Sequence, residues 1–369
     1  IANYTSSLIN NIGHNFHIYA PYTKSLLRDD EPYVFRCWEL TKPFSEEIKN
    51  NILDHNISTI IIQFNFGFFD FLSLRNLLKF LSDNHIIIIL QMHSTIEPIG
   101  QEDKKLLSLV SSLLLIDRIL VHTCSDLNRL KSMEIINNVS IFPHGILDFH
   151  SDKKMSLTRN SVRSIFKNKK YKYKFATSGY CLPNKGFFEL IQSISLLLEK
   201  KLSFHFTFFT PIYNSNYDTY GEKIVSLVNE LKLEKYITLD FHYYDDLDLL
   251  RSLSEMDAII YPYQSSNESS SASVRQGIAS GSRVMVTPIS IFEDVKNVVD
   301  VLPGISPEDM ALGISDWIHF NEDENNLENK NYKIKLLSNW RENHLFSNLS
   351  RRLSGLITAL VLDKKFNNK

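Results

Sequence analysis

The chain has 369 residues, 43% of them hydrophobic, with three cysteines and a formal net charge of −2. Its length predicts two domains of ordinary size, each with its own core, and its balanced charge offers no field that would attract nucleic acid. The cysteines, Cys37, Cys124 and Cys181, lie far apart without the spacing of metal ligands, so neither a disulfide framework nor a zinc site is indicated and a reducing cytoplasm is favoured. No apolar run in the sequence approaches the roughly 20 residues of a membrane-spanning helix.

The first 150 residues alternate between short apolar runs and amphipathic segments. Short apolar runs are typical of buried parallel strands, and apolar residues at helical spacing predict helices. In chain order we expect a helix at 3–12, a strand at 15–20, a helix at 46–54, a strand at 59–64, a helix at 72–82, a strand at 86–90, a helix at 106–116, a strand at 118–122, a helix at 125–130 and a strand at 139–142. This alternation indicates an α/β fold with a parallel sheet.

A basic segment interrupts the alternation. From Lys153 to Lys174 there are nine Lys or Arg residues and no Asp or Glu. We interpret it as a solvated connection between two domains. The alternative is a patch that contacts an anionic membrane surface, since clustered lysines near Tyr171 and Tyr173 would suit one.

The second half of the chain repeats the alternation. We expect a strand at 174–178, a helix ending at 198, a strand at 204–209, a helix at 221–231, a strand at 236–239, a helix at 247–254, strands at 257–263 and 283–288 with a short helix between them, and a helix at 340–362. The predicted organisation is two tandem Rossmann-like domains, at 1–150 and 175–340, joined by the basic linker at 151–174 and with a cleft between them. A C-terminal helix within 341–369 is expected to pack back towards the first domain.

The polar loop between the strands at 257–263 and 283–288 is the strongest candidate for a binding site. Ser270, Ser271 or Ser273 can cap the short helix that follows it. The free N–H groups of that first turn, with the helix dipole behind them, favour an anion such as phosphate. Phosphate would repel the carboxylate of Glu268, which precedes the serines, so Glu268 more plausibly accepts hydrogen bonds from the hydroxyls of a sugar.

Several motifs occur here in the order of a known enzyme family. They are Met92-His93-Ser94, Pro143-His144-Gly145-Ile146, the loop from Gly179 to Gly186, and the run from Glu268 to Gln276. In this order nearly the whole chain resembles a bacterial family-four-type glycosyltransferase of the GT-B fold, a group of retaining enzymes that use nucleotide sugars. The resemblance implies that the family's first strand and its glycine-containing loop are missing before Ile1.

The chain departs from the family pattern at three positions. Asn65 lies in a loop where one subgroup commonly has Glu, Tyr180 occupies the place of an Arg, and Gln276 replaces the second Glu of the Glu-x7-Glu motif. Loss of the Arg removes a cation from the expected diphosphate site, which Arg275 or Arg251 could replace. The departures keep a second interpretation open, in which the chain is an inactive GT-B subunit that binds a partner or a glycan.

The resemblance implies a role for each candidate residue. His93 would meet the reactive side of the sugar and Glu268 its hydroxyls; His144 would be a structural residue of its loop. The implied donor-binding residues are Gly179, Lys185, Ser270, Ser271 and Gln276, and the implied acceptor-binding residues are Asn65, Phe66 and Ser94. No further cofactor is expected, since the nucleotide-diphosphate sugar is itself a substrate. No metal is expected either, because no carboxylate pair is placed to bridge a diphosphate to Mg²⁺.

The function implied is transfer of a sugar to a glycan or lipid-linked acceptor during surface polysaccharide synthesis. The enzyme would work in the cytoplasm, or at the inner face of the membrane if the basic segment binds there. A nucleotide-sugar epimerase is a further alternative, although it would need more acids and bases around the sugar than the motifs supply. An inactive subunit, by contrast, predicts that no nucleotide binds.

Overall fold

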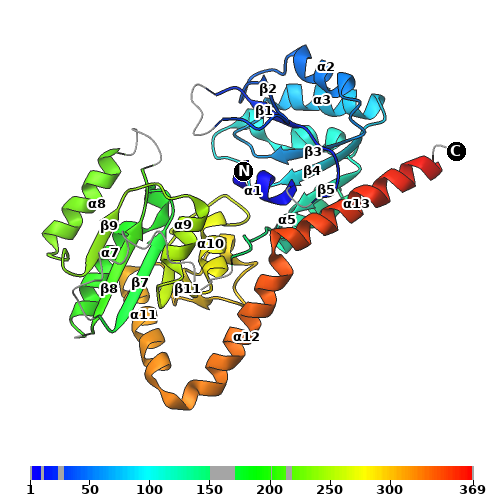
Figure 1. The fold of residues 1–369 in the computed structure, drawn as a ribbon. Helices are drawn as coiled ribbons and strands as arrows, with labels where there is room; N and C mark the ends of the chain where they lie inside the picture. The colour runs from blue at the N-terminus through cyan, green and yellow to red at the C-terminus, as the bar shows by residue number, and fades with distance from the viewer. Residues whose placement is uncertain are drawn as a thin grey trace. The chain divides into compact units, whose positions relative to one another are not determined.

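The computed structural model describes residues 2–9, 12–23, 29–149, 171–200, 202–212 and 218–367. They form two compact units, coloured along the chain in Figure 1. Unit 1 consists of Ile1–Gly145, Asn267–Ser270 and Phe346–Lys369, and unit 2 of Ile146–Ser266 and Ser271–Leu345. The predicted basic linker lies outside the described residues except for its last four positions, 171–174.

Unit 1 is built on a parallel sheet. Its strands are β1 (Ile18–Pro21), β2 (Val34–Trp38), β3 (Thr59–Phe64), β4 (Ile87–Met92), β5 (Arg118–Val121) and β6 (Val139–Ile141). Within the described ranges the order is β3-β4-β5-β6, all parallel, and β1 and β2 form a separate parallel pair. Its helical elements are α1 (Ala2–Ile9), α2 (Glu46–Asp54), α3 (Phe71–Asp83), η1 (Glu102–Lys104), η2 (Leu106–Leu109), α4 (Val110–Leu113), α5 (Cys124–Ser132) and α13 (Phe346–Asn367).

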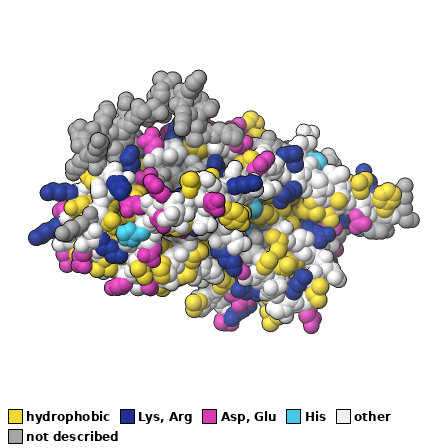
Figure 2. All heavy atoms as spheres, turned by 90° about the horizontal axis from the view of Figure 1, so that it is seen from below, with side chains coloured by type: hydrophobic (Ala, Val, Ile, Leu, Met, Phe, Trp, Pro, Cys, Tyr) yellow, Lys and Arg dark blue, Asp and Glu magenta, His cyan; other side chains and the backbone are white. Residues whose placement is uncertain are grey.

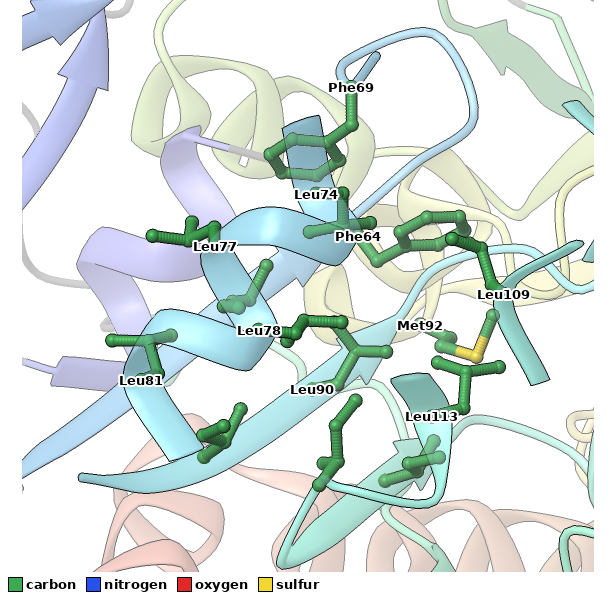
Figure 3. Close-up of a cluster of buried hydrophobic side chains, with 14 of the residues drawn as sticks. Phe64, Phe69, Leu74, Leu77, Leu78, Leu81, Leu90, Met92, Leu109 and Leu113 are labelled. Carbon is green, nitrogen blue, oxygen red and sulfur yellow. The ribbon is translucent and has the colours of Figure 1, made fainter. Parts of the chain in front are cut away.

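The core of unit 1 forms where α3 packs on the sheet (Figure 3). Leu74, Leu77, Leu78 and Leu81 recur at helical spacing, so they share one face of α3 and are buried together. That face meets side chains of β3, β4, η2 and α4, namely Phe64, Leu90, Met92, Leu109 and Leu113. Each fully buried leucine contributes about 1.5–3 kcal/mol to stability, which fixes the strands whose ends carry the candidate residues.

Unit 2 contains a second parallel sheet. Its strands are β7 (Tyr173–Ser178), β8 (Phe204–Phe209), β9 (Ile237–Asp240), β10 (Ala258–Tyr261), β11 (Arg283–Val286) and β12 (Asp300–Val301). Its helical elements are η3 (Pro183–Lys185), α7 (Phe187–Leu198), α8 (Asp218–Glu230), α9 (Asp246–Leu253), α10 (Ala272–Ser280), η5 (Ser290–Phe292), α11 (Pro307–Glu322), η6 (Glu324–Asn326) and α12 (Leu327–His344).

The strand order of this sheet locates a binding edge. Among the strands described, the order is β12-β11-β10-β7-β8-β9, with every pair parallel. Numbered from the first strand of the unit, this is the 3-2-1-4-5-6 order of nucleotide-binding Rossmann sheets. The order reverses between β7 and β10, and ligands of such sheets bind beyond the carboxyl ends of the strands at that reversal.

The structure corrects two predicted helices. Residues 106–116 form the short elements η2 and α4 rather than one helix. The helix predicted at 340–362 is interrupted at Leu345, whose φ of −57° and ψ of 138° are extended, so α12 ends before it and α13 begins after it. The carbonyl of His344 accepts a hydrogen bond from Ile146 N at 2.8 Å, so it is engaged outside the helix.

The last helix, α13, belongs to unit 1. Its Ser350 hydroxyl donates to the carbonyl of Leu8 in α1, and Lys364 lies 3.5 Å from the carboxylate of Asp117 at the start of β5. On the face drawn in Figure 2, Lys and Arg side chains are intermixed with Asp and Glu. Of the helices in the described ranges, none is both long enough and apolar enough to cross a membrane.

Candidate functional site

Two loops meet at the point where the strand order of unit 2 reverses. One loop, residues 179–186, follows β7. The other, residues 262–271, follows β10; its residues 262–266 and 271 belong to unit 2, and its residues 267–270 belong to unit 1. Gln264 N donates to the carbonyl of Asn184 at 3.0 Å, which joins the two main chains. The predicted donor-binding residues Gly179, Lys185, Ser270 and Ser271 are therefore all carried by these two loops.

Lys185 lies against the second loop. Its ammonium nitrogen is 3.8 Å from the centroid of the Tyr263 ring, a cation–π contact. Tyr263 is fully buried, and its hydroxyl lies 3.3 Å from the hydroxyl of Ser271. The aromatic ring thus holds a half-buried cation close to the first residues of α10.

Gly186 and Gly179 allow this close approach. Gly186 has a φ of +74°, and a Cβ built on it would lie 1.8 Å from the carbonyl oxygen of Pro262. Gly179 has a φ of +130°, and its Cβ would lie 3.1 Å from the hydroxyl of Ser273. Only glycine adopts such backbone angles readily and leaves this space unfilled. Gly186 therefore lets the two loops approach each other, and Gly179 lets the first loop approach α10.

Ser271 is the serine that caps α10. Its φ of −95° and ψ of 119° are extended, and its hydroxyl accepts from Val274 N at 3.3 Å. Of the three serines that the sequence left open for this role, the geometry selects Ser271. The first turn of α10 consequently starts beside the Tyr263–Lys185 contact, where N–H donors and a cation can serve one anion.

The two arginines considered as replacements for the missing cation each form an ion pair with a carboxylate. Arg275 is buried, donates to the carbonyl of Ser271 and forms an ion pair with Asp294. Arg251 pairs with Asp248 within α9 at 2.6 Å. Both arginines are thus paired with carboxylates, and the possibility that Arg275 or Arg251 replaces the lost charge has no support from these contacts.

Gln276 lies on α10 and contacts a neighbouring helix. Its side-chain amide donates to the carboxylate of Asp246 at 2.8 Å. Asp246 is the first residue of α9, so this bond joins the two helices. This contact with Asp246 is sufficient to explain why the position is polar. The predicted role of Gln276 in donor binding stays a prediction.

In unit 1, His93 is part of a chain of hydrogen bonds at the carboxyl edge of the sheet. His93 Nδ1 lies 3.2 Å from His122 Nε2, and His122 Nδ1 lies 3.1 Å from the carbonyl oxygen of Phe142. Because a carbonyl can only accept, His122 carries a proton on Nδ1. The side-chain oxygen Oε1 of Gln63, 2.7 Å from His93 Nε2, can likewise only accept, so a neutral His93 carries its proton on Nε2 and donates it to Gln63.

Aromatic rings surround this chain. Tyr4 lies edge-on to His93, with ring centroids 5.0 Å apart, and also contacts His144 at 4.8 Å. His144 is buried, and its Nδ1 lies 2.8 Å from the carbonyl of Gly145. The role of His144 as a structural residue of its loop stays a prediction. Across the described part of the chain, no three His, Cys, Asp or Glu residues are grouped as a metal ion would require.

The protonation of His93 leads to a stability prediction. Burial of the imidazole, and then the neighbouring His122, hold the pKa of His93 well below its usual range. As the pH falls through about 6.5 the unfolded chain takes up this proton first, so the free energy of unfolding should fall by about 1.4 kcal/mol per pH unit until the folded pKa is reached. Urea unfolding at pH 7.5, 6 and 5 should show that the free energy of unfolding falls less with decreasing pH for His93→Gln than for the wild type. The exposed His242→Gln is the matched control; an equal fall in all three proteins would contradict a neutral His93.

Glu268 lies in the four-residue segment 267–270, which belongs to unit 1. The Ser94 hydroxyl donates to the carbonyl of Asn267 at 2.6 Å, and Ser269 N donates to the carbonyl of His93 at 3.2 Å. Glu268 is exposed between these two anchored neighbours. The structure thus places Glu268 in the same unit as His93, and Lys185 with Ser271 in the other.

The three predicted acceptor-binding residues have different surroundings. Phe66 is 7% exposed and packs in the core of unit 1, so its side chain is held by packing. The carboxamide oxygen of Asn65 accepts from Gly67 N at 3.0 Å and shapes the turn after β3. The Ser94 hydroxyl is engaged by the main chain of Asn267 and Ile96. In this arrangement the side-chain NH2 group of Asn65 can donate a hydrogen bond to an acceptor substrate.

The sequence analysis missed three residues that contact the candidates. They are Gln63, His122 and Asp126. Gln63 and His122 are polar residues at the ends of predicted strands, and Asp126 lies in the first turn of the helix predicted at 125–130, so each position carried a recognisable signal. What the sequence could not show is that these residues contact His93 and Ser269.

The fold resembles solved glycosyltransferase structures. A glycosyltransferase from Rickettsia africae matches with a TM-score of 0.65 and 14% identity, over 85% of this chain and 79% of that one. Anabaena HepE in complex with UDP matches with a TM-score of 0.65 and 11% identity, over 88% and 85% of the two chains. The UDP-forming α,α-trehalose-phosphate synthase from Burkholderia vietnamiensis matches with a TM-score of 0.62 and 11% identity, over 83% and 72%.

The same likeness is not found at the level of sequence. No protein-family model and no curated protein matches the chain. The structural matches extend over most of the chain and include both units. Together with the two parallel sheets, they confirm the α/β GT-B fold, with two Rossmann-like units, that the sequence predicted.

Proposed function

We propose that the chain is a retaining, family-four-type glycosyltransferase that moves a sugar from a nucleotide-diphosphate donor to a hydroxyl of a glycan or lipid-linked acceptor. The observation that carries the proposal is the contact of Lys185 with the ring of Tyr263, whose hydroxyl lies 3.3 Å from that of Ser271, the cap of α10, at the strand-order reversal of unit 2. A cation beside helical N–H donors suits a diphosphate. The binding of UDP by HepE, and of UDP and GlcNAc by the pneumococcal O-GlcNAc transferase GtfA, supports a donor of this class.

The residues proposed to bind the nucleotide-sugar donor act in two ways, by charge and by hydrogen bonding. Lys185 neutralises the diphosphate, while the N–H groups behind Ser271 bind its oxygens without adding charge. Gly179 and Gly186 keep the main chain clear, and Ser270 adds a hydroxyl beside the cap. Because a cation and helical donors already oppose the negative charge, we propose that no bridging metal is needed.

Glu268 and His93 act on the sugar. The exposed carboxylate of Glu268 accepts from sugar hydroxyls, and the Nε2–H group of a neutral His93 donates to another sugar oxygen once the Gln63 side chain turns aside. The acceptor oxygen then bonds to the anomeric carbon as the bond from that carbon to the phosphate oxygen breaks. The leaving diphosphate takes both electrons of the broken bond and the proton of the acceptor hydroxyl, so no paired carboxylates are required.

One set of contacts favours a second candidate, a GT-B subunit that binds a partner or glycan without catalysis. Tyr180 stands where the family has Arg, and Arg275 and Gln276 are engaged with Asp294 and Asp246. A donor site with one lysine binds a diphosphate less strongly than a site with two cations. The two candidates differ in one measurable property, which is donor binding.

Replacement of Lys185 by Ala should weaken donor binding by about ten- to a hundredfold. Loss of one hydrogen bond to a charged group removes about 1.5–3 kcal/mol. A thermal-shift panel of UDP-, GDP-, ADP- and CMP-sugars measures this, since a ligand at about 100 times its dissociation constant stabilises the protein by about 2.7 kcal/mol. We expect one nucleotide class to raise the melting temperature of the wild type and to lose most of that shift in the variant.

Lys200→Ala is the matched control, because this exposed lysine follows the opposite end of α7 from Lys185. It should keep the wild-type shift. If no donor shifts the wild type, the chain is the non-catalytic subunit. If Lys185→Ala keeps the full shift, the diphosphate lies elsewhere.

A further inference from the structure

The segment that carries Glu268 is held by a buried carboxylate. Ser269 is 7% exposed, and its hydroxyl donates to Asp126 Oδ1 at 2.8 Å. Asp126 is 2% exposed and lies in the first turn of α5, directly after β5. A carboxylate can only accept hydrogen bonds when ionised, so the direction of this bond is fixed and the serine must face it.

Both oxygens of Asp126 have further donors. Thr95 donates to Oδ1, and Thr123 donates to Oδ2 through its hydroxyl at 2.6 Å and its N–H at 3.2 Å. Arg129 lies 3.8 Å from Oδ1 and also donates to the hydroxyl of Thr95. A buried charge is tolerated only when it is hydrogen-bonded or paired, and Ser269 completes this set.

The other side of Glu268 is held separately. Ser94 donates to the carbonyl of Asn267, and Ser269 N donates to the carbonyl of His93. The residues immediately before and after Glu268 are thus fixed to the loop that follows β4. Fixing one residue's backbone costs about 1–2 kcal/mol of conformational entropy, and here that ordering is already present before any sugar binds.

We infer that Ser269, Asp126 and Ser94 are positioning residues that hold Glu268 for its contact with the donor sugar. The inference rests on the proposed function, because it gives these residues an effect only through Glu268. It assigns Ser94, expected from the sequence to bind the acceptor, to the orientation of the Glu268 segment instead.

Ser269→Ala is the variant that isolates this role. Asp126 also caps α5, as its bonds with Thr123 show, so replacing it would disturb the helix as well. Ser269→Ala removes one donor and leaves the cap and Thr95 in place. Ser269→Thr keeps the hydroxyl and is the conservative variant, and Ser265→Ala removes an exposed hydroxyl from the same loop as a control.

The test measures release of nucleoside diphosphate from the donor that the thermal-shift panel identifies, with water or a simple sugar as acceptor. For Ser269→Ala we expect kcat to fall about tenfold or more while the donor dissociation constant stays within about twofold. Amide hydrogen exchange of a peptide covering 267–271 should speed up in the same variant. Ser269→Thr should recover most of kcat, and Ser265→Ala should match the wild type.

A double-mutant cycle separates this inference from the proposed function. If Ser269 acts through Glu268, the loss caused by Ser269→Ala should shrink towards onefold when Glu268 is already Gln. An equal loss in both backgrounds, or an unchanged kcat in the single variant, overturns the positioning role. Absence of donor binding, or an unchanged rate in Glu268→Gln, instead overturns the proposed function.

Discussion

Glu268→Ala should lower kcat for sugar transfer by about 10²- to 10⁴-fold while the protein stays folded and still binds its donor. Two hydrogen bonds from sugar hydroxyls to a carboxylate contribute about 3–6 kcal/mol together. Glu268 is exposed, so its truncation should change the free energy of unfolding by no more than about 0.5 kcal/mol. Steady-state rates of nucleoside diphosphate release, alongside urea unfolding, measure both expectations.

Glu255→Ala is the matched control for this loss of activity. Glu255 is an exposed glutamate of unit 2 that precedes β10, whereas Glu268 lies beyond the carboxyl end of that strand. Loss of one exposed negative charge at the far end of the strand should leave kcat unchanged. A Glu268→Ala enzyme with the wild-type rate would refute a contact between this carboxylate and the sugar.

Apart from β2 and the short β12, the strands could be predicted from the sequence, but their order could not. Runs such as Thr59–Phe64 and Phe204–Phe209 are apolar, short and bounded by polar residues, so each indicates a buried strand by itself. The pairing of β7 with β10 joins residues more than 80 positions apart. Nothing local encodes that pairing, yet it creates the reversal at which Lys185 meets Tyr263.

The sequence analysis overlooked two helices. In α11, Met310, Ile314 and Ile318 are buried at helical spacing after the cap Ser306, a local pattern that could have been recognised, whereas α12 has a weak local pattern. In α12, Leu337 is the buried residue among the side chains described, so the helix shows almost no apolar stripe. By contrast, α3 buries five residues on one face and was predicted within two residues of its ends. A helix that buries few apolar side chains leaves little apolar periodicity in the sequence.

The candidate site shows the same division between local and distant causes. The capping box of α5, Thr123 with Asp126, is a local pattern that the sequence carries openly. A further partner of Asp126 is Ser269, which is 143 residues away. Polar residues at strand ends could therefore be named as candidates, but their contacts with distant residues could be identified only from the fold.

Gly186→Ala should destabilise the protein and remove donor binding at once. An Ala at a φ of +74° costs about 1–2 kcal/mol, and its Cβ would overlap the carbonyl of Pro262, which is main chain and cannot rotate away. Separating the two loops should cost a further 1–3 kcal/mol, roughly as overpacking does. Because Lys185 precedes Gly186 and Tyr263 follows Pro262, the same movement breaks their contact.

Thermal unfolding with and without the identified donor measures this change. A loss of about 2–5 kcal/mol should lower the melting temperature by roughly 4–20 °C, and the donor should then give little stabilisation. Gly355→Ala is the control: it lies in α13 with no atom within 4 Å of its Cβ position, so it should be neutral or stabilise by up to about 1 kcal/mol. A Gly186→Ala protein as stable as the wild type would mean that the loops after β7 and β10 do not meet, and the diphosphate site built on their contact would have to be abandoned.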